Sequence, residues 1–159
     1  MLSTLLVLAV AATAVFATLY FTAGDEASGP SAVEIDELRE SALAVADDVA
    51  VKVTSLSYRD FDAQRTAILE MGTERFADEY GGTLDGMRSV VTETRSVNTG
   101  TIRYSAVAEV DEQRATAIVF VNQTGQSTLA PEDVGNAARL LITLSRVDDR
   151  WLVDAISYP

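Results

Sequence analysis

Twenty-one consecutive residues without a charge, near the start of the chain, constrain the fold more than any other feature. The run begins at Leu2, ends at Thr22 and reads LSTLLVLAVAATAVFATLYFT. As a helix it would reach roughly 31 Å, enough for a hydrocarbon core of about 30 Å. A single span in that core must be helical, because its backbone groups find no water there. The sequence therefore predicts a transmembrane anchor over residues 1–23, which makes the membrane the first partner of the chain.

A cleaved signal peptide is the alternative to an anchor. Ala12-Thr13-Ala14 and Val15-Phe16-Ala17 have the small-x-small pattern of a cleavage site. The apolar run is nevertheless longer than the roughly 7–15 residues of a signal peptide's apolar region. Tyr20 and Phe21 stand at its end, where aromatic side chains favour the headgroup boundary. We therefore predict an uncleaved, single-pass anchor. No Lys or Arg precedes the run, so charge does not indicate which side of the membrane the following residues occupy.

The composition excludes several kinds of function. The formal net charge is −12, and nucleic acids and anionic bilayer surfaces repel a domain that is so acidic. The chain has no Cys and no His, which excludes disulfides, thiolate nucleophiles, imidazole bases and the usual zinc ligands. We therefore predict no catalytic residues, no metal site and no cofactor. The expected role is non-enzymatic and is performed at a membrane.

A polar linker, residues 24–33, leads into a long amphipathic helix. Ser31 and Glu34 have the spacing of a capping box, in which each side chain accepts a bond from an otherwise unpaired backbone amide. We predict a helix over residues 34–56, because apolar residues recur at spacings of three and four: Ile35, Leu38, Ala42, Val45, Val49, Val53 and Leu56. The stripe is short for a coiled-coil seam and contains small residues. We therefore favour packing on a sheet of the same domain over a coiled coil.

Two shorter helices are predicted next. Asp60 or Asp62 is a candidate N-cap for a helix over residues 63–71, which ends near a glycine. Thr73 is a candidate cap for a third helix, in which Phe76 and Tyr80 share a face at i,i+4. Consecutive glycines at 81 and 82 weaken this helix, although apolar residues permit it to resume towards residue 93.

The hydrophobic period changes from 3.6 to 2 after residue 95. In residues 102–110 the even-numbered side chains are Ile, Tyr, Ala, Ala and Val, which predicts a strand with these side chains on its buried face. The expected sequel is a turn at 111–113, a strand at 114–123, an exposed loop at 126–136, a strand around 140–144, a tight turn at Asp148 and Asp149, and a strand at 151–158. Helices first and antiparallel strands afterwards indicate an α+β domain.

Residues 34–159 are therefore predicted to form one domain, in which a curved antiparallel sheet wraps the long helix as a cone. This arrangement is typical of the nuclear transport factor 2-like fold, also called the cystatin-like cone. The strand at 114–123 has two candidate faces. One carries Ile118 and Phe120; the other is lined by small residues and suits either the domain's own core or a partner sheet in a homodimer or heterodimer.

Several segments resemble the Mce-associated (mammalian cell entry) membrane proteins of actinobacteria. The likeness covers nearly the whole chain, from the anchor to Ser157. It depends on the order of degenerate motifs: Tyr58 before an acidic turn, Thr73-x-x-Phe76, the strand AxxxxFVNQ at 115–123, and Trp151-Leu152-Val153 after a turn. In that last turn, Asp148 and Asp149 replace the Asp-Gly pair that is more usual in the family.

The resemblance implies an extracytoplasmic domain, similar to the soluble part of VirB8 assembly factors, on a single-pass anchor in the cell membrane. It also implies a non-enzymatic accessory subunit that assists or stabilises an Mce-type lipid or sterol importer, with protein partners in that complex. Two alternatives remain open. One is a VirB8-like scaffold of a secretion or conjugation machine, and the other is a carrier or enzyme of the same fold that takes a small ligand.

An apolar cavity is the one candidate binding site in the sequence. Five aromatic residues are candidates to line a lipid-sized cavity, with ordinary core packing as the alternative: Phe76, Tyr80, Tyr104, Phe120 and Trp151. Glu109 and Asp154 are the acids that fall within predicted strands, and so they are the candidates for an inward-facing base. Of these two, Glu109 is placed by alternation on the side opposite the apolar face. The acids of the predicted turns are expected to be solvated.

Overall fold

The computed structural model describes residues 29–131 and 134–159. The chain divides into two units, Met1–Glu34 and Ile35–Pro159. In the first unit, the predicted capping box is present: the Ser31 N–H donates to Glu34 Oε2 (2.7 Å), and the Glu34 N–H donates to Ser31 Oγ (3.3 Å). The bond from the Ser31 amide lowers the pKa of the Glu34 carboxyl. The predicted anchor lies outside the described residues, and no helix within them is both long and apolar enough to span a bilayer.

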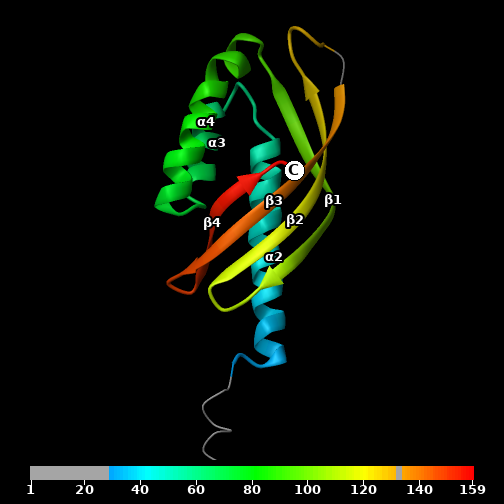
Figure 1. The fold of residues 1–159 in the computed structure, drawn as a ribbon. Helices are drawn as coiled ribbons and strands as arrows, with labels where there is room; N and C mark the ends of the chain where they lie inside the picture. The colour runs from blue at the N-terminus through cyan, green and yellow to red at the C-terminus, as the bar shows by residue number, and fades with distance from the viewer. Residues whose placement is uncertain (1–28, 132–133) are drawn as a thin grey trace, which may run out of the picture. The chain divides into compact units, whose positions relative to one another are not determined.

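Within the residues that the structure describes, three helices and four strands follow one another in the predicted order. They are α2 (Ala32–Thr54), α3 (Phe61–Leu69), α4 (Glu74–Glu93), β1 (Val97–Val110), β2 (Arg114–Gln126), β3 (Val134–Val147) and β4 (Arg150–Ser157). The sheet has the order β1-β2-β3-β4, and each neighbouring pair is antiparallel. Figure 1 shows α2 crossing behind the curved sheet, with α3 and α4 on the β4 side. The predicted α+β class and the packing of helices on an antiparallel sheet are confirmed.

The core lies between α2 and the inner face of the sheet. Ala42, Ala46 and Ala50 of α2 are fully buried. The same hydrophobic cluster contains the inward side chains of β2 and β3, each at most 1% exposed: Ala115, Ala117, Val119, Val121, Leu140, Ile142 and Leu144. The alanines of α2 and the small inward side chains of β2 let the helix lie close to that strand, which leaves the larger Ile118 and Phe120 on the opposite side. Over this part of α2, packing on the domain's own sheet is the observed arrangement.

Two bulges in β1 overturn the strict alternation predicted for that strand. The pairing with β2 shifts after Ile102 and again after Val107. A bulge adds one residue to a strand, which exchanges its two faces beyond that point. Tyr104, Ala106 and Ala108 are therefore exposed, although the sequence pattern places them on the buried face, and Val107 packs against the core instead.

The helix ends follow local signals with two exceptions. The Thr73 hydroxyl caps α4 as predicted, but Asp60, at the N-cap of α3, makes no side-chain capping bond. Helix α2 ends at Thr54, slightly earlier than expected. The glycines at 81 and 82 do not interrupt α4, because Gly81 is buried against α3 and tertiary packing outweighs the low helix propensity of glycine.

The loop predicted at 126–136 is shorter than expected. Strand β2 continues to Gln126 and β3 already begins at Val134, because pairing with a neighbouring strand outweighs the polar, Gly-containing sequence. The tight turn between β3 and β4 is confirmed. Its two residues, Asp148 and Asp149, have φ angles of 47° and 59°, as a two-residue type I′ hairpin requires. Asp accepts this left-handed conformation more readily than most non-glycine residues.

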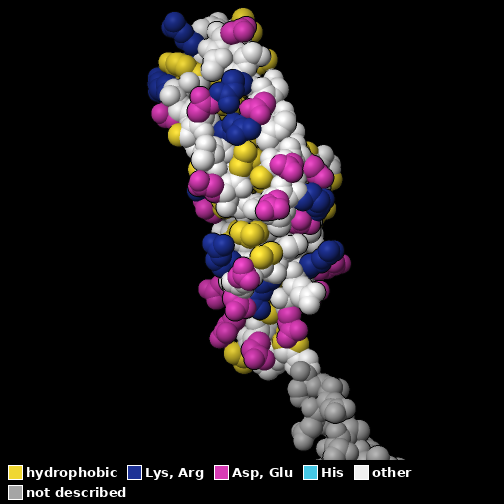
Figure 2. Space-filling view, turned by 90° about the vertical axis from the view of Figure 1, so that its left-hand side faces the viewer, with side chains coloured by type: hydrophobic (Ala, Val, Ile, Leu, Met, Phe, Trp, Pro, Cys, Tyr) yellow, Lys and Arg dark blue, Asp and Glu magenta, His cyan; other side chains and the backbone are white. Residues whose placement is uncertain are grey.

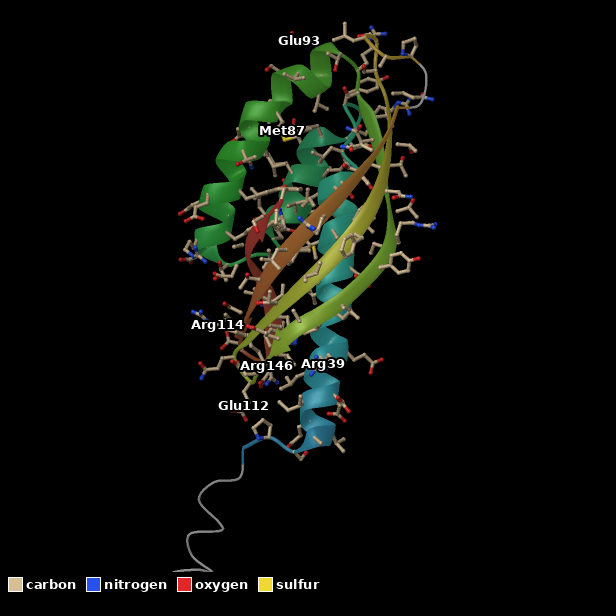
Figure 3. The ribbon with its side chains drawn as sticks, turned by 45° about the vertical axis from the view of Figure 1, so that its right-hand side comes forward. Arg39, Met87, Glu93, Glu112, Arg114 and Arg146 are labelled. Carbon is tan, nitrogen blue, oxygen red and sulfur yellow. The ribbon has the colours of Figure 1, made fainter. Side chains whose placement is uncertain are left out.

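The turn between β1 and β2 is held by its own aspartate. Asp111 Oδ1 accepts hydrogen bonds from the backbone N–H groups of Gln113 (2.7 Å) and Arg114 (2.8 Å), which lower the pKa of this carboxyl. The Arg146 N–H donates to the Gln113 carbonyl at 2.8 Å and so ties the turn to β3. Figure 3 shows Glu112, Arg114 and Arg146 together at this end of the sheet.

Each edge strand of the sheet is partly paired with one of the two loops that flank α3. Ser57 forms an isolated antiparallel bridge with Val97 on the β1 edge. Gly72 forms a parallel bridge with Val153 on the β4 edge, where the Val153 N–H donates to the Met71 carbonyl at 2.9 Å. These bridges fasten the connections around α3 to the sheet, and so position that helix beside it.

Candidate protein-binding surface

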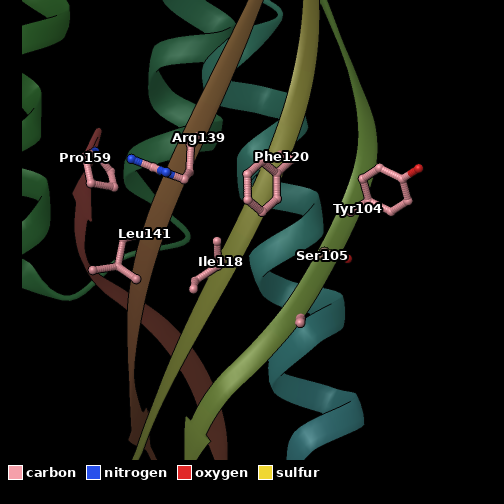
Figure 4. A pocket seen from close by; sticks show the side chains of 8 residues that line it. Tyr104, Ser105, Ile118, Phe120, Arg139, Leu141 and Pro159 are labelled. Carbon is pink, nitrogen blue, oxygen red and sulfur yellow. The ribbon is translucent and has the colours of Figure 1, made fainter.

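The side of the sheet away from the helices carries an apolar surface. Directly opposed residues of neighbouring strands share a face. The register aligns Tyr104 with Phe120 and Phe120 with Arg139. We define the outer patch as the apolar residues of this ladder and of the next one: Tyr104, Ala106, Ile118, Phe120 and Leu141. Figure 4 shows the labelled side chains of this surface on the strands, with α2 behind them.

The outer patch is open rather than enclosed. It borders a depression of about 440 Å³, which Arg139 and Pro159 also line. Tyr104 is 73% exposed and Phe120 is 43% exposed. Sites for small molecules usually bury most of the ligand's surface, which a surface as open as this does not do. Contiguous exposed apolar surface is more typical of a contact with another protein.

Exposed charged side chains on the face of the outer patch include Arg139, Glu109 and Arg114. None of these three forms an ion pair with any residue that the structure describes. Glu109, a candidate base in the sequence, is opposite Thr116 on the outward side of β2 and is exposed, so it does not face the core. The charges near α4 are different: Arg65 binds Asp85 at 2.8 Å, and this bond lowers the pKa of the Asp85 carboxyl. Figure 2 shows acidic and basic side chains distributed over that side of the molecule.

The structure does not bring the five predicted cavity residues into one cavity. Phe76 is 2% exposed and stacks on Tyr80 with ring centroids 5.0 Å apart. Trp151 is 7% exposed, and its Nε1–H donates to Ser41 Oγ at 3.0 Å. These three residues belong to the core or its border, whereas Tyr104 and Phe120 lie on the other side of the sheet. The separation follows from the bulges in β1 and from the outward orientation of the Phe120 side of β2.

A second depression, of about 210 Å³, lies between α4 and β4 and includes Tyr80 and Asp154. The Asp154 carboxylate forms an ion pair with Arg75 and accepts a hydrogen bond from Thr73 Oγ1 at 3.2 Å. Its oxygens are therefore occupied by structural contacts, which does not suit a catalytic base. The hydroxyls of Tyr80 and Tyr158 are 3.2 Å apart, and burial, followed by the contact with Tyr158, raises the pKa of Tyr80.

The similarity of this chain to known proteins lies in its fold and not in its sequence. No family model and no curated protein matches the sequence. An IcmL-like type IV secretion system protein from Legionella pneumophila has 10% identity and a TM-score of 0.65, over 83% of this chain and 94% of that protein. The periplasmic domain of DotI has 13% identity and a TM-score of 0.60, over 84% and 98% of the two chains. CagV, a VirB8 homolog of the type IV secretion system of Helicobacter pylori, has 13% identity and a TM-score of 0.54, over 72% and 96%.

The described domain has a VirB8-like fold. This agrees with the predicted helices on a curved antiparallel sheet and with the predicted likeness to VirB8 soluble domains. At identities of 10–13% the likeness concerns the fold alone. None of the comparisons supports an association with mammalian-cell-entry proteins, so that association stays a prediction from the sequence motifs.

Proposed function

We propose that this chain is a non-enzymatic scaffold subunit of a secretion or conjugation machine in the cell envelope. In this proposal residues 2–22 anchor it in the membrane by a single pass, and the VirB8-like domain is extracytoplasmic. The domain contributes binding surface to a larger assembly and performs no chemical step.

The observation that carries the proposal is the extent of the fold match to secretion proteins. The likeness to the IcmL-like protein and to the DotI periplasmic domain covers 83% and 84% of this chain and nearly all of those domains. The helices and strands therefore correspond as a whole domain rather than as a shared motif. The predicted anchor precedes that domain directly in the sequence, which suits a subunit held at a membrane surface.

The interior of the domain also favours a scaffold over an enzyme. The space between α2 and the sheet is filled by side chains with essentially no exposure, including Val49 of α2 and Ile142 and Leu144 of β3. Asp154, the acid of the depression beside α4, is held by Arg75. Among the described residues, no cluster of three Asp or Glu side chains is arranged to hold a metal ion. On the outer side of the sheet the domain presents an apolar surface, which suits a protein contact.

Affinity purification of the full chain in mild detergent tests this proposal. We expect secretion-channel subunits to be recovered with the full chain, and not with a matched bait that contains residues 1–33 alone. Recovery of lipid-transporter subunits without any secretion subunit would overturn the proposal. The genomic neighbourhood is an independent check, because a scaffold subunit is expected to be encoded beside other components of its machine.

An accessory subunit of a mammalian-cell-entry lipid importer is the second candidate. The order of the sequence motifs favours it, although Thr73 and Trp151 have structural roles here as a helix cap and a core residue. The same purification separates the two candidates by the identity of the recovered subunits. Native mass spectrometry of the purified chain tests the third candidate, a small-ligand carrier, because a tightly bound lipid would require a site that the open outer patch does not provide.

A further inference from the structure

We infer that the outer patch is the docking site for an amphipathic helix of another protein, one whose apolar stripe is bordered on both sides by Asp or Glu. The inference rests on the proposed role of the domain as a binding surface, and it names the chemistry of the partner. It does not depend on the machine to which the chain belongs, because it follows from the register of the sheet and from the charges around the patch.

The aromatic end of the outer patch is a row of side chains across three strands. Tyr104 of β1 is opposite Phe120 of β2, and Phe120 is opposite Arg139 of β3 (Figure 4). Arg103 is the extra residue of the bulge beside Tyr104, and it is exposed. Because β1 is an edge strand, the long side chain of Arg103 reaches the rim of the patch from there. An arginine therefore stands at each end of an exposed aromatic pair.

The two arginines of this row have no opposite charge of their own. Neither forms an ion pair with any residue that the structure describes, Pro159 at the rim of the depression included. The other end of the same face has acids beside its arginine, since Glu109 and Glu112 lie close to Arg114 in the chain and in the sheet (Figure 3). The aromatic end is therefore a local concentration of positive charge on a chain whose formal net charge is −12.

The spacing of Arg103 and Arg139 fits a helix. They lie on β1 and β3, so two strand spacings of about 4.8 Å separate their backbones by about 10 Å. A helix with its side chains is about 10–12 Å across. Acidic residues on its two flanks therefore reach both guanidinium groups while its apolar stripe covers Tyr104 and Phe120. An extended segment fits less well, because its same-face side chains are about 7 Å or about 13 Å apart.

Apolar and charged contacts at this site select the same partner. The depression of about 440 Å³ is lined by Ile118, Phe120 and Leu141, and it receives the apolar anchors that groove-binding helices carry at spacings of three and four. Carboxylates at the border form bidentate bonds with the arginines, and a basic helix is repelled by them. An anionic bilayer is also attracted by arginine, but the acidic remainder of the chain repels it.

Fluorescence anisotropy of labelled peptides with the full chain in mild detergent tests the chemistry of the partner. The probe is a synthetic helix of about five turns, with Leu at spacings of three and four and Glu on both flanks of that stripe. In the control peptide, Lys replaces every Glu and the Leu positions are unchanged. The Glu peptide should bind about tenfold more tightly at physiological ionic strength, with a difference that shrinks as salt is added. Equal affinities, preference for the Lys peptide, or no binding of either would overturn the inference.

Charge reversal locates the site on the domain. Arg103→Glu and Arg139→Glu should each weaken binding of the Glu peptide by about tenfold, because each places like charges opposite one another. The double variant should bind the Lys peptide in preference. Arg59→Glu is the matched control, since Arg59 is exposed, lies before α3 and undergoes the same change of charge. It should leave both affinities unchanged, and an equal loss with this control would reduce the effect to net charge and refute the site.

The same variants separate this inference from the proposed function. In the affinity purification described above, a subunit that docks on the outer patch should be lost with the Arg103→Glu, Arg139→Glu bait and kept with the Arg59→Glu bait. Secretion subunits recovered equally with both baits would contradict the docking site and leave the scaffold proposal standing. Sedimentation covers a second copy of the chain as the occupant: a dimer of the natural chain that the double variant loses would also contradict the inference.

Discussion

Glycine-to-alanine substitutions at two positions should change the stability of this domain in opposite directions. Gly82 is exposed to solvent in the middle of α4, and a Cβ atom added there would meet no atom within 4 Å. Gly100 lies in β1, where an added Cβ would overlap Thr54 Oγ1 and approach Val121 Cγ1 to 3.1 Å. Thr54 cannot turn away without cost, because its hydroxyl donates to the Ala50 carbonyl at 2.6 Å in the core.

These contacts set the expected magnitudes. Gly82→Ala should raise the free energy of unfolding by about 0.5–1 kcal/mol, because alanine restricts the unfolded chain and favours the helix. Gly86→Ala, for which a Cβ is equally unobstructed, should add a similar amount. Gly100→Ala should lower the free energy of unfolding by about 1–3 kcal/mol, as is usual when a well-packed core is overfilled.

Urea unfolding of residues 31–159 measures both effects. Far-ultraviolet circular dichroism follows the helices, and fluorescence of Trp151, which is the one Trp of the chain, follows the core. Coincident transitions are expected for a small domain with one core. A less stable Gly82→Ala variant, or a Gly100→Ala variant as stable as the natural chain, would refute the packing described for α4 and β1.

Three further predictions concern capping, pH and the anchor. Thr73→Ala should lower the free energy of unfolding by about 0.5–2 kcal/mol, whereas Thr73→Ser should retain most of the stability, as measured by urea unfolding. The hydrogen bond from Arg65 lowers the pKa of Asp85 in the folded state. The ionised Asp85 carboxylate therefore stabilises the fold above the pKa of the unfolded chain, near 3.9, and this stabilisation is lost as the pH falls through the lower pKa of the folded state. Asp85→Asn should therefore flatten the fall in melting temperature below about pH 4, and an unchanged pH profile would contradict this. Replacing both Leu8 and Ala11 with Arg should release the full chain from membranes on fractionation, and a natural chain that is already soluble would contradict the anchor.

Local signals in the sequence were sufficient to predict the helices. The capping bonds of Ser31 with Glu34, and of Thr73 with Phe76, join residues three positions apart. The stripe on α2 repeats at the period of the helix itself. Such features depend on neighbours in the sequence, so they can be read without knowledge of the tertiary structure.

The outer patch could not be predicted because its orientation depends on distant contacts. From the sequence alone, either face of β2 could be the buried one: the face with Ile118 and Phe120, or the face with small side chains. The alanines of α2 pack against the small side chains, which places Ile118 and Phe120 on the outside. The bulges in β1 bring Tyr104 to the same face, and alternation alone gives no sign of them. Arg139 was not a candidate residue, since only the pairing of β2 with β3 places it beside Phe120.

The bridges and bulges along the edges of the sheet have a consequence for the behaviour of the protein at high concentration. An uninterrupted edge strand is a template on which further chains can add, and it is a common origin of fibrils. Here β1 is interrupted twice, and both edges are partly occupied by the bridges that Ser57 and Gly72 form. Chains with such edges should resist open-ended strand addition, so that crowding favours closed, finite complexes over fibrous aggregates.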